Sequence, residues 1–538
     1  MRRSFVNEFN DIYVYDLRGD KEFRRLTKEQ LEAEGDNIFA SGSKSPIAIT
    51  LLVRNPESEH HGVVHYYDVG SYLSLDEKKE RLAEIVSADP DWKVIETDKY
   101  GDWFNKRDDS FEQFIPMALE KEQRPSGIFW NYSLGLNTNR DAWVYNFSDD
   151  VLSEHVQTLI DVYNENVERC EKSQNKAEYT FAYDDPHIKW SSSLEASCRR
   201  GTRGDYDQNC IVLSQYRPFC KKYVYFDRLL NQRVFQQKKF FPNGNTSNIE
   251  ICVSEKGVFV TKLLPDLELI HGAQCFPLYW YEEVEPEEIE VGYNTLFGAD
   301  QGALIFEDSD TSATCNGKRY VRHNAITNTA LRVFRNVYPH TRITKEDIFY
   351  YIYGILHSPE YCRRFENNLK KELPRIPLAK DFKAFMKAGR ELADLHLNYE
   401  SVDRWPLMEQ GDKANPGRTV QMTYPVKVKD PETGKKVPDR TILKVAENLT
   451  IHGIPLRAYE YVVNGKSAIG WLIDRYKVTT DKKSGIVNDP NEYSDDPRYI
   501  VDLVERVITV SMRTLDIVDS LPPLDELPQP ADWPSEWR

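Results

Sequence analysis

The stretch YIYGILHSPEYCRRF (residues 351–365) places a His, a Ser and a Tyr beside a Pro, as a catalytic cluster would. Apolar residues repeat at helical spacing from Ile348 and stop at Ser358. Thr344, with Asp347 three residues later, predicts a capping box at the start of that helix. A Ser at the cap followed by a Pro opens a second helix. The stretch therefore predicts a corner between two helices, with Ser358 occupied in capping rather than in nucleophilic catalysis.

Helical patterns also occur on both sides of this corner. Residues 380–400 place one apolar stripe along a helix, and we expect His396 on that stripe to be a core residue rather than a ligand. Ser148 is expected to cap the helix that follows it, and a last helix is expected near residues 497–519. Residues 205–280 are β-rich and aromatic, which indicates a mixed α+β region.

The N-terminal residues show an α/β pattern. Residues 10–19, 45–55 and 62–70 each predict a buried strand, and residues 74–87 predict a helix with Ser74 as its N-cap. Two or three strands cannot close a doubly wound sheet. We therefore expect an exposed, unfinished sheet edge that another chain or upstream sequence would complete.

The composition is that of a soluble globular protein. The chain has 538 residues, which suggests two to four domains, and 29% of its residues are charged. No apolar run is long enough for a membrane span, and the N-terminus is not a signal peptide. Eight cysteines occur without CxxC pairs, which indicates neither a zinc ribbon nor a disulfide framework and predicts a reducing cytoplasm.

Positive charge is concentrated in two stretches, although the formal net charge is −16. Residues 214–241 and 317–342 interleave Arg and Lys with aromatic and amide residues, whereas acidic residues gather at 281–292 and 306–310. The basic stretches suit contact with phosphates and base edges, and each could equally be a solvated basic face.

The catalytic sequence motifs that the chain partly resembles are incomplete. NGKS near Lys466 lacks the first glycine of a P-loop, because Glu460 occupies that position. PDWKVIETDK (90–99) resembles a PD-(D/E)xK nuclease, but its second carboxylate is out of register. We find no glycine-rich loop for S-adenosylmethionine and no Asn/Asp-Pro-Pro-aromatic tetrapeptide. No catalytic and no metal-binding residues are predicted.

Several long stretches of the sequence match a known family and follow one another in the same order as in that family. RRSFVNEFNDIYVYDLRG, TNRDAWVYNFS, YRPFCKKYVYFDRLLNQR, QCFPLYWYE, YGILHSPEYCRRFENNLKKELPRIP and VNGKSAIGWLIDRYKV together span nearly the whole chain. The sequence resembles the C-terminal half of the Type ISP restriction–modification enzymes. These polypeptides combine a nuclease, a translocase, an adenine-N6 methyltransferase and a target-recognition domain.

The resemblance implies two parts. Residues 1–125 would be the C-terminal portion of a Rossmann-like methyltransferase sheet, an incomplete α/β domain. Residues 126–538 would be a mixed α+β target-recognition, or specificity, domain. We expect no cofactor in this chain, and S-adenosylmethionine only in the complete enzyme. The expected partners are double-stranded DNA and an upstream chain that carries the rest of the methyltransferase.

The expected function is sequence-specific DNA recognition that supports adenine-N6 methylation in a complete enzyme. Two alternatives stay open: half of a split methyltransferase, active only with an upstream chain, and an inactive remnant with a structural or interaction role. An ion pair between Arg140 and Asp141 is expected to order a loop. The residues predicted to contact DNA are Arg217, Lys221, Lys222, Arg319, Arg322, Asn324 and Arg335. The first three belong to the family-like stretch YRPFCKK, and the others are chosen by charge and residue type.

Overall fold

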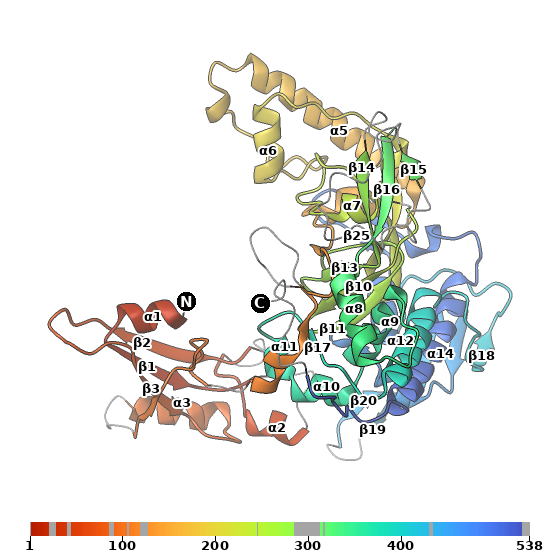
Figure 1. Ribbon diagram of the computed structural model, residues 1–538. Coiled ribbons are helices and arrows are strands. Elements are labelled where there is room, and N and C mark those ends of the chain that lie inside the picture. Colours follow the sequence, from red (N-terminus) through yellow and green to blue (C-terminus); the bar gives the residue numbers. More distant parts are fainter. Residues whose placement is uncertain are drawn as a thin grey trace. The chain divides into compact units, whose positions relative to one another are not determined.

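The computed structural model describes residues 2–20, 28–39, 45–85, 91–104, 107–118, 127–244, 246–284, 312–315, 318–429 and 434–529. The chain forms two compact units, Met1–Arg107 and Asp108–Arg538 (Figure 1). The domain boundary expected at residue 125 stays a prediction, since residues 119–126 lie outside the described residues. No helix in the described part of the chain is long and apolar enough to cross a membrane.

The first unit is built on a four-stranded sheet with the order β2-β1-β3-β4. Its strands are β1 (Asp11–Asp16), β2 (Ala48–Val53), β3 (Val63–Asp68) and β4 (Lys93–Ile95), and its helices are α1 (Arg2–Glu8), α2 (Lys28–Ala33) and α3 (Leu75–Glu84). Strands β1 and β3 are parallel, whereas β2 and β4 are antiparallel to their neighbours. Ser74 forms the predicted cap of α3 as a complete capping box with Glu77.

One expectation for this unit is wrong. Residues 45–55 do contain a strand, β2, but the strand is not buried. It lies at the edge of the sheet, and Ile49 and Leu51 are 46% and 61% exposed. A continuous apolar run is typical of a strand covered on both faces. Within the described residues, β2 pairs only with β1, and its side chains are exposed or half-buried.

The second unit combines helices with several small sheets, as the expected mixed α+β fold requires. Two four-stranded sheets have the orders β11-β10-β13-β6 and β12-β8-β9-β7, and a three-stranded sheet has the order β14-β16-β15. Their strands are β6 (Ser133–Leu134), β7 (Tyr145–Asn146), β8 (Ile211–Arg217), β9 (Cys220–Tyr225), β10 (Glu250–Ser254), β11 (Gly257–Thr261), β12 (Leu264–Pro265), β13 (Gln274–Pro277), β14 (Tyr279–Val284), β15 (Ser312–Cys315) and β16 (Lys318–Asn324).

Smaller sheets complete the unit. The strands are β5 (Ile115–Pro116) with β17 (Arg375–Ile376); β18 (Met408–Gly411), β21 (Ile442–Ala446) and β22 (Leu449–His452); β19 (Lys427–Lys429) with β20 (Lys436–Pro438); β23 (Val462–Val463) with β24 (Lys466–Ser467); and β25 (Thr479–Thr480) with β26 (Val487–Asn488). The helices are α4 (Asp141–Val144), α5 (Asp149–Lys172), α6 (Ser192–Arg199), α7 (Gln237–Phe240), α8 (Asn328–Val337), α9 (Lys345–Leu356), α10 (Pro359–Arg364), α11 (Glu366–Leu369), α12 (Phe382–Leu397), α13 (Ala468–Arg475) and α14 (Tyr499–Asp519).

The corner at residues 351–365 is confirmed. Thr344 and Asp347 form the capping box of α9, and Ser358 caps α10 by accepting a hydrogen bond from the backbone N–H of Tyr361. His357 is half-buried and its Nδ1 lies 2.9 Å from the carbonyl oxygen of Tyr353. Burial lowers the pKa of His357 to about 4, so its ring is neutral at pH 7.

Helices α9 and α12 pack closely because glycines face each other. A Cβ on Gly354 would lie 2.1 Å from the carbonyl oxygen of Phe385, and a Cβ on Gly389 would lie 1.9 Å from that of Tyr350. His396 of α12 is buried as expected, between the hydroxyls of Tyr353 and Thr514.

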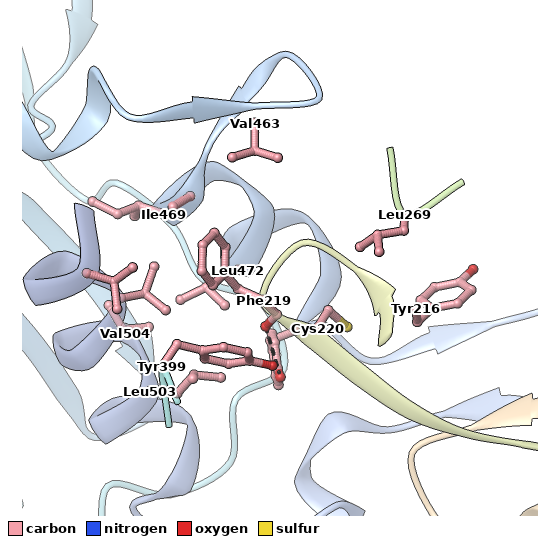
Figure 2. Packing of buried hydrophobic residues seen from close by; sticks show 14 of the residues in the cluster. Tyr216, Phe219, Cys220, Leu269, Tyr399, Val463, Ile469, Leu472, Leu503 and Val504 are labelled. Carbon is pink, nitrogen blue, oxygen red and sulfur yellow. Dashed lines mark hydrogen bonds between the residues drawn. The ribbon is translucent and has the colours of Figure 1, made fainter. Parts of the chain in front are cut away.

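The turn of the β8–β9 hairpin belongs to the core of the second unit. Phe219, in this turn, is fully buried and meets Tyr399 edge-on with ring centroids 5.3 Å apart. Figure 2 shows Phe219 and Cys220 among Tyr399, Leu472 and Val504, which come from segments far along the chain. The stretch YRPFCKK is therefore part of the packed interior.

Candidate nucleic-acid interface

The three predicted DNA contacts on the β8–β9 hairpin have their charges bonded inside the protein. The side chain of Arg217 is 11% exposed, and its Nη1 lies 2.7 Å from Oδ1 of Asp266. The guanidinium also lies 3.9 Å from the ring centroid of Tyr216. Asp266 is itself 3% exposed, so this ion pair is buried. A guanidinium in this position neutralises a carboxylate that would otherwise be buried alone.

The charged groups of Lys221 and Lys222 are also bonded to other protein groups. Nζ of Lys221 lies 2.6 Å from Oε2 of Glu400, and this lysine side chain is 10% exposed. Lys222 is 8% exposed, donates to Oδ1 of Asn488 at 3.0 Å and lies over the ring of Phe147. Burial lowers the pKa of Lys222 to about 8. These cations tie the hairpin to the C-terminal half of the unit.

The four remaining predicted contacts lie on β16 and α8. Arg319 and Arg335 are exposed, and Arg322 and Asn324 are half-buried. The guanidinium of Arg322 lies 4.4 Å from the ring centroid of Tyr279, on the neighbouring strand β14. The side-chain oxygen of Asn324 accepts from the backbone N–H of Ile326 at 2.9 Å, which shapes the turn that leads toward α8.

Helix α8 has one buried face and one basic face. Thr327 caps the helix, and Ala330 and Phe334 are its buried residues. Arg332 and Arg335 are exposed. The spacing of three and four residues explains this division, because residues so spaced share one face of a helix. Strand β16 and helix α8, joined by three residues, form the surface that we call the β16–α8 segment (residues 318–337).

Three stacked rings, one of them on β16 itself, line the β16–α8 segment, and none of them was among the predicted DNA contacts. Trp280 of β14 is opposite His323 of β16, with ring centroids 4.4 Å apart. Trp130, which is 38% exposed, is stacked with Trp280 at 6.5 Å. Nε2 of His323 lies 3.0 Å from Oε2 of Glu282. The signal in the sequence was the pair of tryptophans in FWNYS and YWYEE, but their proximity depends on strand pairing.

The expected ion pair between Arg140 and Asp141 does not form. Arg140 is fully buried and donates to the carbonyl oxygens of Leu230 and Lys189 and to the hydroxyl of Ser191. Asp141 accepts instead from Thr138 and from the hydroxyl of Tyr216. Adjacent residues at a helix start point in different directions, so neighbours in sequence did not become partners. Burial lowers the pKa of Arg140 to about 10.

The NGKS motif is a hairpin turn, in agreement with its rejection as a P-loop. Asn464 and Gly465 have φ values of +45° and +70° and join strands β23 and β24. Lys466 forms an ion pair with Asp474. The lysine is thus bonded to a carboxylate where a P-loop lysine would reach toward phosphate.

Comparison with known proteins identifies the family. The model of the Type ISP C-terminal specificity domain matches residues 127–503. The chain therefore belongs to the Type ISP specificity-domain family. No curated protein matches.

Solved structures agree with this assignment. A nuclease-deletion mutant of the Type ISP restriction–modification enzyme LlaGI, in complex with a DNA substrate mimic, is 36% identical with a TM-score of 0.76; the match covers 98% of this chain and 45% of that chain. The ATP-dependent Type ISP restriction–modification enzyme LlaBIII bound to DNA is 33% identical with a TM-score of 0.79, over 98% of this chain and 32% of that chain. A DrdV–DNA complex is 28% identical with a TM-score of 0.74, over 97% of this chain and 48% of that chain. The chain thus spans less than half the length of these relatives.

Proposed function

We propose that this chain performs sequence-specific recognition of double-stranded DNA as the specificity portion of a Type ISP restriction–modification enzyme. The observation that carries the proposal is the family match over residues 127–503, together with similarity to three structures described as DNA complexes. An exposed basic segment next to stacked aromatic rings supports it, because such surfaces suit phosphate and base contacts.

We assign different roles to the seven predicted DNA contacts. Arg319 and Arg335 are exposed and would reach phosphates or guanine edges, and Asn324 suits adenine. Arg322 would contribute charge from its position over Tyr279. We infer that Arg217, Lys221 and Lys222 stabilise the fold and do not contact DNA, because their charges are bonded to protein groups.

We also propose that the N-terminal residues, expected as 1–125, are the end of a Rossmann-like methyltransferase sheet. The parallel pair β1–β3 supports this, since parallel strands require a crossover connection and are the building unit of such sheets. In a complete enzyme, S-adenosylmethionine and the flipped adenine would bind to a chain that carries the family's cofactor loop and catalytic tetrapeptide. Adding such a chain and S-adenosylmethionine to this one, then measuring N6-methyladenine in DNA, tests the proposal.

The DNA-binding proposal is tested by selection from a random double-stranded pool at two salt concentrations. We expect one enriched sequence and a salt-sensitive affinity. The double variant Arg319→Ala/Arg335→Ala should bind that sequence with a log–log salt slope smaller by about 2, since each lost phosphate contact removes about 0.9. Arg513→Ala on α14 is the matched control, because Arg513 is also an exposed arginine of the second unit.

Two results would contradict the proposal. One is a pool without enrichment at either salt concentration. The other is equal binding by the double variant and the Arg513→Ala control, which would mean that the β16–α8 segment does not contribute to DNA binding.

A further inference from the structure

Three potential metal ligands lie together in the core of the second unit, on strands β10 and β13. Glu250 and Cys252 are two residues apart on β10, so their side chains share one face of the sheet. Cys275 of β13 is directly opposite Cys252 in the strand register. All three residues are fully buried, and their ligand atoms lie within 4.8 Å of one another.

The carboxylate of Glu250 has too few partners for its environment. Its Oε2 accepts from Nε2 of Gln237 at 3.5 Å, which is a long hydrogen bond. Within the described residues, Oε1 of Glu250 and Oε1 of Gln237 have no hydrogen-bond partner. The carboxyl group of Glu250 also interacts with the thiol of Cys275. Buried carboxylates are normally paired with a cation or coordinate a metal ion. Two buried oxygens without a donor or a metal ion call for a missing binding partner.

The spacing of the two thiols fits a shared metal ion better than a disulfide. Sγ of Cys252 lies 3.5 Å from Sγ of Cys275, which also contacts the carbonyl oxygen of Ala273 at 3.7 Å. A disulfide needs about 2.0 Å between its sulfurs. Two sulfurs bound to one tetrahedral zinc at about 2.3 Å each lie about 3.8 Å apart.

We propose that Cys252, Cys275 and Glu250, with Oε1 of Gln237 as a fourth ligand, form a structural site for Zn²⁺. Two thiolates and a carboxylate are typical zinc ligands, and the soft sulfurs favour zinc over magnesium or calcium. Binding replaces the two thiol protons, which pass to solvent, and no electron is transferred. A bound ion would link β10, β13 and α7 (Gln237–Phe240) in the core. The proposal is independent of the DNA-binding proposal.

The test is the metal content of the whole chain, purified without a histidine tag from zinc-supplemented medium. Elemental analysis should find about one zinc per chain, as a closed site of this type requires. Growth with cobalt in place of zinc should give the sulfur-to-cobalt charge-transfer absorption that only thiolate ligation produces. The variant Cys252→Ser/Cys275→Ser should lose the metal and the absorption.

A second buried cysteine pair provides the matched control. Cys170 of α5 and Cys198 of α6 are also fully buried, but they belong to a different hydrophobic cluster from Cys252 and Cys275. The variant Cys170→Ser/Cys198→Ser should keep the zinc. If the Cys252→Ser/Cys275→Ser variant does not fold, the cobalt spectrum of the unaltered chain decides the question.

The proposal would be overturned by three results. They are a metal-free folded chain without cobalt absorption, zinc that persists in Cys252→Ser/Cys275→Ser, and an intact mass that shows Cys252 and Cys275 joined as a disulfide.

Discussion

The β8–β9 hairpin and the β16–α8 segment both carry arginines among aromatic rings, yet they hold their charges in opposite environments. In the hairpin, Arg217 is paired with Asp266 and Lys221 with Glu400, in the interior of the unit. In the β16–α8 segment, Arg319 and Arg335 are exposed. Basic composition alone therefore does not mark a DNA-binding surface, and the location of the acidic partners makes the difference.

The largest expected effect comes from Arg217→Met. The substitution leaves Asp266 buried without its cation, so the free energy of unfolding should fall by about 3–5 kcal/mol in urea titrations. DNA affinity of the folded protein should stay unchanged. Arg332→Met is the exposed control, with an expected change in stability within about 0.5 kcal/mol. A small loss of stability together with weakened DNA binding would instead identify Arg217 as a DNA contact. The β8–β9 hairpin and the β16–α8 segment would then not differ in function.

A pH series probes the buried lysine of the hairpin. Burial lowers the pKa of Lys222 from 10.5 to about 8. Between these values the unfolded chain binds a proton that the folded chain does not, so this lysine makes stability rise with pH, by at most about 1.4 kcal/mol per pH unit. Lys222→Met lacks this contribution. Wild type should therefore gain about 3 kcal/mol relative to the variant from pH 8 to 10.5. A constant difference would mean that Lys222 is charged and solvated, like the arginines of β16–α8.

Asn324→Ala tests base reading in the exposed segment. An amide that pairs with adenine contributes about 1–3 kcal/mol of discrimination, so the variant should bind a relaxed set of sequences in a pool selection. The salt slope should not change, since no phosphate contact is lost. Unfolding free energy should fall by about 1 kcal/mol, because the bond to Ile326 is lost. An unaltered sequence preference would contradict base reading by Asn324.

Arg335→Ala should have the smallest effect. Loss of one phosphate contact would weaken binding to all sequences alike and reduce the log–log salt slope by about 0.9. Titrations at several salt concentrations measure this slope, with Arg513→Ala as control. Equal slopes for both variants would remove α8 from the proposed interface.

Local signals in the sequence predicted much of the fold correctly. The capping box at Thr344, the cap at Ser358 and the core position of His396 are confirmed. Each depends on residues within about one helical turn or on one apolar stripe. The exposure of β2 and the separate partners of Arg140 and Asp141 were not predictable in the same way. Both depend on which distant segments cover a side chain.

The sequence by itself therefore determined the family, the helix ends and the two basic stretches, because motifs, caps and composition are properties of neighbouring residues. Only the tertiary structure decided which basic residues are exposed and which cysteines meet. Asp266, Glu400 and Asn488 reach the hairpin from distant segments, and strand register alone places Cys275 opposite Cys252. Burial and charge pairing are set by such long-range contacts, which no local pattern contains.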